Sequence, residues 1–176
     1  MHGSLWAIIL MKIRTNKIMQ RTLGQRGHDF TIQAVPLPTE LAKLVDSGFK
    51  TEQDCVLLKT VDHGQGQLDT DYKKTEYEDF ENHIHIDNYV SDPSDEFEYL
   101  KVGLEFGKRI YNKLKADLRT DFRITISYSE TVHAGQEIET YGGCVVRFYK
   151  VRPTCDNKFR VDNLDKFETE GVLVIE

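Results

Sequence analysis

The length and composition of the chain are those of a folded protein with one domain. It has 176 residues, of which 39% are hydrophobic and 30% are charged, and these values exclude a disordered or low-complexity chain. A formal net charge of -6 argues against general binding of nucleic acid or of an anionic membrane surface. We therefore expect a single domain over residues 1–176 that binds neither nucleic acid nor membrane.

The N-terminus opens with a short apolar run, residues 5–11. A membrane-spanning helix needs about 20 apolar residues, so this run is too short. Basic residues follow the run instead of preceding it, which is the reverse of a secretory signal. We expect either a first strand here or, over residues 1–12, a disordered or additional N-terminal extension.

Three elements are predicted next. Residues 30–34 alternate apolar and polar side chains, as a half-buried strand does. Thr39 is expected to cap a short helix that Gly48 ends. Residues 55–61 are mostly apolar and predict a buried strand.

The acidic segment, residues 62–99, holds twelve acidic residues against two lysines, a net charge of about -10. No apolar periodicity appears between residues 62 and 81, so this part predicts a solvated, partly mobile loop. Acidic side chains with interspersed rings can also steer a basic protein partner and then bind it. The candidate partner-binding residues are Asp69, Asp71, Tyr72, Glu76, Tyr77, Glu78, Asp79, Phe80 and Glu81.

Residues 83–87 (HIHID) have a period of two. In a strand, His83, His85 and Asp87 would share one face, while the isoleucines between them would face the core. Two imidazoles and a carboxylate are suitable ligands for zinc or iron(II), which makes this face a candidate metal site. The alternative is the solvated polar face of an ordinary antiparallel strand. Apart from this metal, the sequence indicates no cofactor.

Residues 92–118 predict a long helix, with Asp92 as the N-cap and Pro93 at its first position. Apolar residues recur at steps of three and four and form one broad face. We expect this face to lie across a sheet, and the alternative is pairing with a second copy of the chain. The residues of this face are Phe97, Leu100, Leu104, Phe106, Gly107, Ile110, Tyr111, Leu114 and Leu118.

Strand patterns dominate the remainder of the chain. Residues 122–128 alternate, residues 144–151 and 171–176 are largely apolar, and residues 130–141 fit a long loop between the first two strands. With the preceding helices, this order predicts an α+β fold: a mainly antiparallel sheet covered on one face by a long helix and a shorter one.

The cysteines and the motifs give no catalytic residue. Cys55, Cys144 and Cys155 are an odd number without a C-x-x-C pair, so we expect reduced thiols in the cytoplasm. Cys144 is expected in the core, and Cys155, which follows Pro153 in a turn, is expected to be exposed. Neither a nucleophile elbow nor a phosphate-binding loop is present in the sequence.

Residues 141–153 (YGGCVVRFYKVRP) and 165–175 (DKFETEGVLVI) resemble the C-terminal ends of small uncharacterised bacterial proteins, some of which resemble immunity proteins that neutralise polymorphic toxins. The resemblance implies a binding protein, and it transfers no functional residue. We therefore expect a protein-binding module, in its specific form an immunity-type inhibitor that presents its acidic surface to a basic partner. The alternatives are a metal-dependent enzyme built on residues 83–87 and a self-associating structural domain. The sequence does not fix the oligomeric state.

Overall fold

The computed structural model describes residues 11–24, 34–64, 66–95, 97–129 and 143–176. Residues 1–10 of the predicted N-terminal run or extension and the loop predicted at 130–141 lie outside these residues, as does most of the strand predicted at 30–34. In the part of the chain that is described, no helix is both long enough and apolar enough to cross a membrane.

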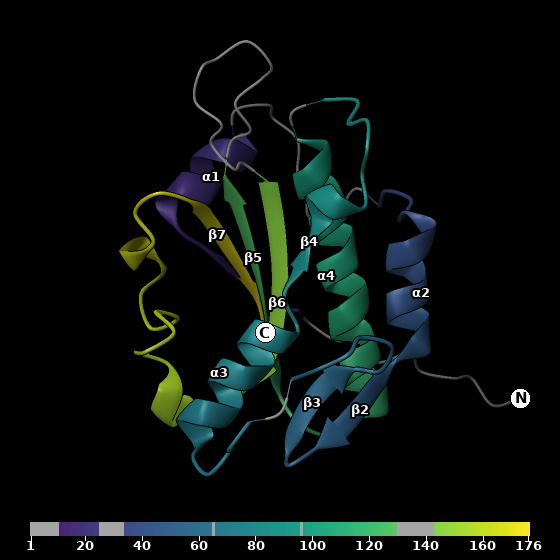
Figure 1. The fold of residues 1–176 in the computed structure, drawn as a ribbon. Coiled ribbons are helices and arrows are strands. Elements are labelled where there is room, and N and C mark those ends of the chain that lie inside the picture. The colour runs from purple at the N-terminus through teal and green to yellow at the C-terminus, as the bar shows by residue number, and fades with distance from the viewer. Residues whose placement is uncertain (1–10, 25–33, 65, 96, 130–142) are drawn as a thin grey trace, which may run out of the picture.

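A five-stranded antiparallel sheet forms the centre of the protein (Figure 1). Its strands in spatial order are β1 (Ile13–Thr15), β7 (Gly171–Ile175), β5 (Phe122–Ser129), β6 (Gly143–Lys150) and β4 (Ile84–His85). All five residues of β7 are buried, as the apolar run predicted, because this strand lies between β1 and β5. A separate antiparallel hairpin consists of β2 (Phe49–Glu52) and β3 (Cys55–Leu58), so the strand predicted at 55–61 ends earlier than expected.

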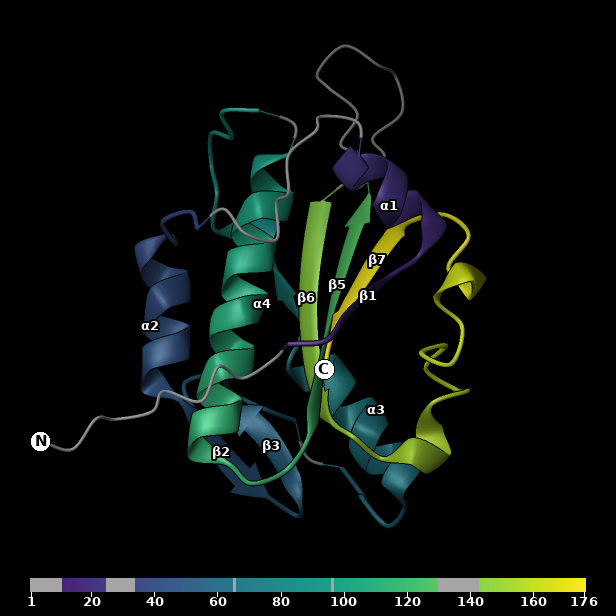
Figure 2. The ribbon, with the colours of Figure 1, turned by 180° about the vertical axis from the view of Figure 1, so that it is seen from behind.

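The first face of the sheet is covered by the long helix α4 (Glu98–Asp117), and α2 (Thr39–Ser47) lies alongside α4 (Figures 1 and 2). The α+β fold with helices on this face is thereby confirmed. Leu100, Leu104 and Leu114 are at most 1% exposed, because α4 turns its apolar face to the sheet. This face is part of the core and is not free to pair with a second copy of the chain.

The starts of α4 and α2 both differ from the prediction. α4 begins at Glu98 and not after Asp92, because the Asp95 carboxylate accepts a hydrogen bond from the backbone N–H of Phe97 and closes a separate turn before the helix. Pro38, not Thr39, occupies the N-cap position of α2. Gly48 ends α2 with a φ of 76°, as expected for a glycine in the left-handed region.

The second face of the sheet is covered by residues 153–170, which contain the short 3-10 turns η2 (Pro153–Cys155) and η3 (Leu164–Lys166). Val161 and Leu164 pack there against β7, and α1 (Lys17–Gly24) also contacts β7. Cys155 is only 4% exposed, so its predicted exposure is wrong. The turn η2 packs against the helix α3 (Asp71–Glu81) and encloses the thiol. Cys144 lies in the core as predicted, and all three cysteines are free thiols.

An ion network ties the middle of this second face to its edge. Arg123 donates to Asp156 at 2.9 Å and to Glu176 at 3.0 Å, and Glu176 also accepts from Arg14 at 2.9 Å. Burial alone would raise the pKa of Glu176, but the hydrogen bonds from Arg14, Arg123 and Lys12 outweigh burial and lower the pKa to about 2.

The largest difference from the sequence prediction is α3 (Asp71–Glu81), which occupies part of the expected loop. Thr70 caps α3 by accepting a hydrogen bond from the backbone N–H of Lys73 at 3.2 Å. The face of α3 that is buried carries Thr75 and Glu78, so it has no apolar periodicity to detect. The prediction of a solvated, partly mobile loop is therefore wrong for residues 71–81.

Candidate functional site

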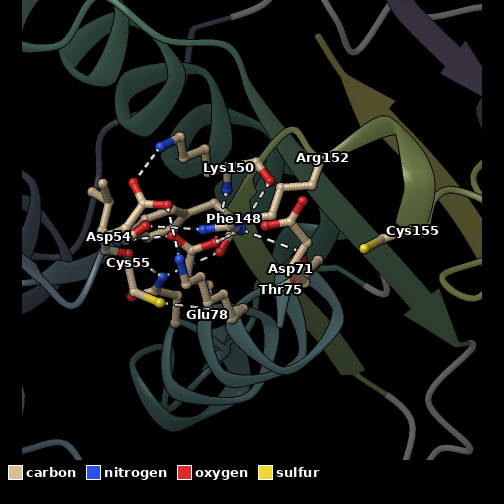
Figure 3. Close-up of polar contacts among 12 residues, drawn as sticks. Asp54, Cys55, Asp71, Thr75, Glu78, Phe148, Lys150, Arg152 and Cys155 are labelled. Atoms are coloured by element: carbon tan, nitrogen blue, oxygen red, sulfur yellow. Dashed lines mark hydrogen bonds and ion pairs between the residues drawn. The ribbon is translucent and has the colours of Figure 1, made fainter. Parts of the chain in front are cut away.

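The buried face of α3 joins the sheet to the β2–β3 hairpin through two polar side chains, Glu78 and Asn82, which are both 0% exposed (Figure 3 shows Glu78). Glu78 accepts hydrogen bonds from the backbone N–H groups of Val56 at 2.7 Å and Lys150 at 3.1 Å. Asn82 donates to the carbonyl oxygens of Val56 at 2.8 Å and Phe148 at 3.2 Å. The two side chains thus bond the backbones of β3 and β6 as a strand between them would.

Arg152 neutralises the buried carboxylate of Glu78 (Figure 3). Its Nη1 atom lies 2.5 Å from Oε2 of Glu78, and its Nη2 atom donates to the Asp54 carbonyl oxygen at 2.9 Å. Burial raises the pKa of Glu78, while the bonds from Arg152 and the two backbone amides oppose that rise. The cluster therefore fixes α3 in place and buries its charges in pairs.

Intramolecular contacts also occupy three of the other candidate residues. The Tyr72 ring packs against Phe159, and the Nζ atom of Lys158 lies 4.1 Å from the centre of the Tyr72 ring. The Tyr77 hydroxyl donates to the Gly64 carbonyl oxygen. Glu81 accepts the Gly64 N–H and contacts the buried ring of His63 at 3.2 Å. Tyr77 and Glu81 thus hold the connection that leads into α3, whereas Tyr72 holds α3 against the segment after β6.

Five candidate residues remain: Asp69, just before α3, and Asp71, Glu76, Asp79 and Phe80 within it. Phe80 is 67% exposed, and Asp69, Asp71 and Glu76 are also exposed. Asp79 is half-buried, and burial raises the pKa of its carboxyl group. Of the nine residues proposed for partner binding, Glu78 alone lies wholly in the interior and is not part of this surface.

The candidate metal residues follow α3 directly. Ile84 and Ile86 are buried, as the alternation predicted, and His85 is exposed. The rings of His83 and His85 lie with their centres 5.3 Å apart, whereas Asp87 belongs to the turn η1 (Ile86–Asn88) after the two-residue strand. Among the described residues, no three His, Cys, Asp or Glu side chains are grouped as a metal ion requires, so the geometry adds nothing to the metal hypothesis.

Sequence reasoning missed three polar residues of this region: Asn82 and Arg152, which bond beneath α3, and Arg147 of β6, whose charge acts on Asp79. Glu78 and Asn82 stand four residues apart, which places them on the same side of a helix. This four-residue spacing is the one feature of the sequence that could have identified Asn82 as a neighbour of Glu78. Nothing in the sequence brings Arg152 to Glu78, since the two are 74 residues apart.

These observations define an α+β protein in which an acidic helix is attached to a sheet edge by buried polar side chains and exposes a phenylalanine. The chain belongs to the uncharacterized protein PM0498 family, whose family model matches residues 14–176. This match covers far more than the C-terminal third that resembled immunity proteins, and it shows no link to them. No curated protein matches the chain, and no solved structure does.

Proposed function

We propose that this protein is a protein-binding module, and that the exposed face of α3 docks onto a partner with a basic surface. Phe80 carries the proposal. Its side chain is 67% exposed, and Ile13, at 37%, is the one other large hydrophobic side chain exposed in the described ranges. Exposed rings of this kind supply much of the affinity of protein interfaces once a partner buries them.

The charge around Phe80 supports a basic partner. Glu76 lies one helical turn before Phe80, so the two side chains share a side of α3. Glu76 makes no ion pair within the described residues, although it accepts a hydrogen bond from Tyr72. The Asp69 carboxylate is partly neutralised by the Nζ atom of Lys73 at 2.8 Å, which leaves Glu76 as the principal negative charge beside Phe80.

The attachment of α3 also favours binding. Because Glu78 and Asn82 hold the opposite side of the helix, the exposed side is ordered before a partner arrives. A preformed surface loses less conformational entropy on association than a mobile loop does. An immunity-type inhibitor of a basic toxin is the specific form of this proposal that the C-terminal resemblance suggests.

The test identifies the partner at one residue and then measures kinetics. A photo-reactive phenylalanine analogue placed at Phe80 should cross-link a basic protein in the native host, and the same analogue at the exposed Asn112 of α4 should not. With that partner, Phe80→Ala should raise the dissociation rate about tenfold or more. Glu76→Lys should slow association at low salt, while Glu168→Lys, an exposed charge-matched control outside α3, should not.

The proposal fails if the two cross-linking positions give the same products. It also fails if Phe80→Ala and Glu76→Lys both leave the binding kinetics of the cross-linked partner unchanged.

A further inference from the structure

A pocket of about 320 Å³ opens on the second face of the sheet, and the protein-binding proposal makes no use of it. Its lining includes His85, Asp87, Ser127, Arg147 and Glu170. Ligand pockets begin at about 300 Å³, so this one has room for a small polar molecule.

The register of three strands places three of these side chains, His85, Ser127 and Arg147, together. Ser127 of β5 and His85 of β4 both pair with Val145 of β6, and Arg147 follows Val145 by two residues. Alternate residues of a strand share a face, so these positions lie on the side of the sheet opposite α4. Paired strands therefore form the floor of the pocket, while η1 contributes Asp87 and the segment before β7 contributes Glu170.

The charges of the pocket are not paired with one another. Across the ranges that the structure describes, the Arg147 guanidinium makes no hydrogen bond and no ion pair, although its charge influences Asp79 of α3. The carboxylates of Asp87 and Glu170 likewise have no hydrogen-bond or ion-pair partner there. One cation and two carboxylates thus line the same pocket without neutralising each other.

Two buried hydroxyl groups next to Arg147 have no hydrogen-bond partner outside their own pair in the described part of the chain. Thr125 pairs with Arg147 across β5 and β6, and Tyr149 follows Arg147 by two residues on the same face. Thr125 Oγ1 and the Tyr149 hydroxyl are buried with no hydrogen-bond partner among the described residues other than each other, and burial raises the pKa of Tyr149 to about 12 although the Thr125 hydroxyl opposes this rise. Ser127, which lines the pocket, is itself only 4% exposed. The surroundings of Arg147 therefore hold hydrogen-bonding capacity that the described residues do not use.

We propose that this pocket binds a small zwitterion of the α-amino acid class. The planar guanidinium of Arg147 matches a carboxylate in two parallel hydrogen bonds, and the Ser127 hydroxyl can donate a third. An ammonium group donates three hydrogen bonds, which Asp87 and Glu170 accept. A ligand with only one of these charges would leave the opposite charge of the pocket unpaired.

The test is calorimetric titration of the full chain with the twenty common L-amino acids, and with acetate and ethylamine as ligands of single charge. At least one amino acid should bind saturably with a Kd below about 1 mM, and neither singly charged ligand should bind comparably. Arg147→Met should weaken that binding about tenfold or more, and so should the double variant Asp87→Asn/Glu170→Gln. Arg109→Met, on the exposed side of α4, is the matched control and should bind as the wild type does.

Circular dichroism and the melting temperature of each unliganded variant verify folding, and the acidic double variant gives an independent measurement should Arg147→Met not fold. The inference is wrong if no amino acid binds at about 10 mM. It is also wrong if acetate binds as tightly as the best amino acid, or if Arg147→Met and Arg109→Met bind equally.

Discussion

Replacing Arg152 by methionine isolates the energetic role of the buried ion pair beneath α3. The substitution preserves most of the side-chain volume but leaves the Glu78 carboxylate, 0% exposed, without its cation. Breaking a buried pair in this way costs about 3–5 kcal/mol. For a domain of this length, each kcal/mol lowers the melting temperature by about 2–4 °C, so we expect a decrease of roughly 6–20 °C.

The pH dependence of Arg152→Met provides a second measurement. Burial already raises the pKa of Glu78, and loss of Arg152 removes an interaction that opposes the rise. A carboxyl group with a raised pKa in the folded state costs stability as the pH increases, because the unfolded chain ionises it more readily. The stability difference from the wild type should therefore be larger at pH 8 than at pH 4.

Urea unfolding at both pH values measures these differences. Arg109→Met, which removes an exposed arginine from a pair with Glu105, should cost only about 0.3–0.5 kcal/mol. A loss of less than about 1 kcal/mol for Arg152→Met, or an equal loss at both pH values, would refute the assignment of Glu78 as a buried charge that depends on Arg152.

Three further predictions concern the core and the ion network. Leu104→Ala, at a side chain 1% exposed, should lower the free energy of unfolding by about 2–5 kcal/mol in urea titrations, and a loss below about 1 kcal/mol would place this face of α4 outside the core. Gly103→Ala should cost about 1–3 kcal/mol, because the added Cβ would lie 2.3 Å from Sγ of Cys144. Adding Cys144→Ala should recover part of that loss, and a purely additive double variant would contradict this steric explanation. Since the folded-state pKa of Glu176 is about 2 against an ordinary 4.5, the wild type should lose stability as the pH falls through this interval. Glu176→Gln should lose less over the same interval, and parallel stability curves would contradict the assigned pKa.

The accuracy of the sequence predictions follows from which side chains are buried. The face of α4 was predictable because its buried residues are apolar and recur with the helical period. β7 was predictable for a similar reason, since all five of its residues are buried. α3 was not predictable, because its buried side chains, Thr75 and Glu78, are as polar as those in a loop.

The candidate sites follow the same distinction between local and distant information. The alternation at residues 83–87 correctly placed Ile84 and Ile86 in the interior, because that pattern depends on adjacent residues. The pocket around Arg147 depends on the register between β4, β5 and β6, which lie far apart in the sequence. No local pattern records that register, so the sequence alone could not group His85 with Arg147.

The hydrogen bonds from Glu78 and Asn82 also determine what can join the sheet. β4 pairs with β6 only at Val145 and Val146, so the rest of that β6 edge would otherwise present unpaired backbone groups. Exposed edges of this kind recruit strands from other molecules and lead to aggregation. By occupying the Phe148 carbonyl and the Lys150 amide, the two side chains close the edge without adding a strand. α3 therefore keeps the sheet from extending into a neighbouring molecule, and its loss would expose a template for intermolecular β-pairing.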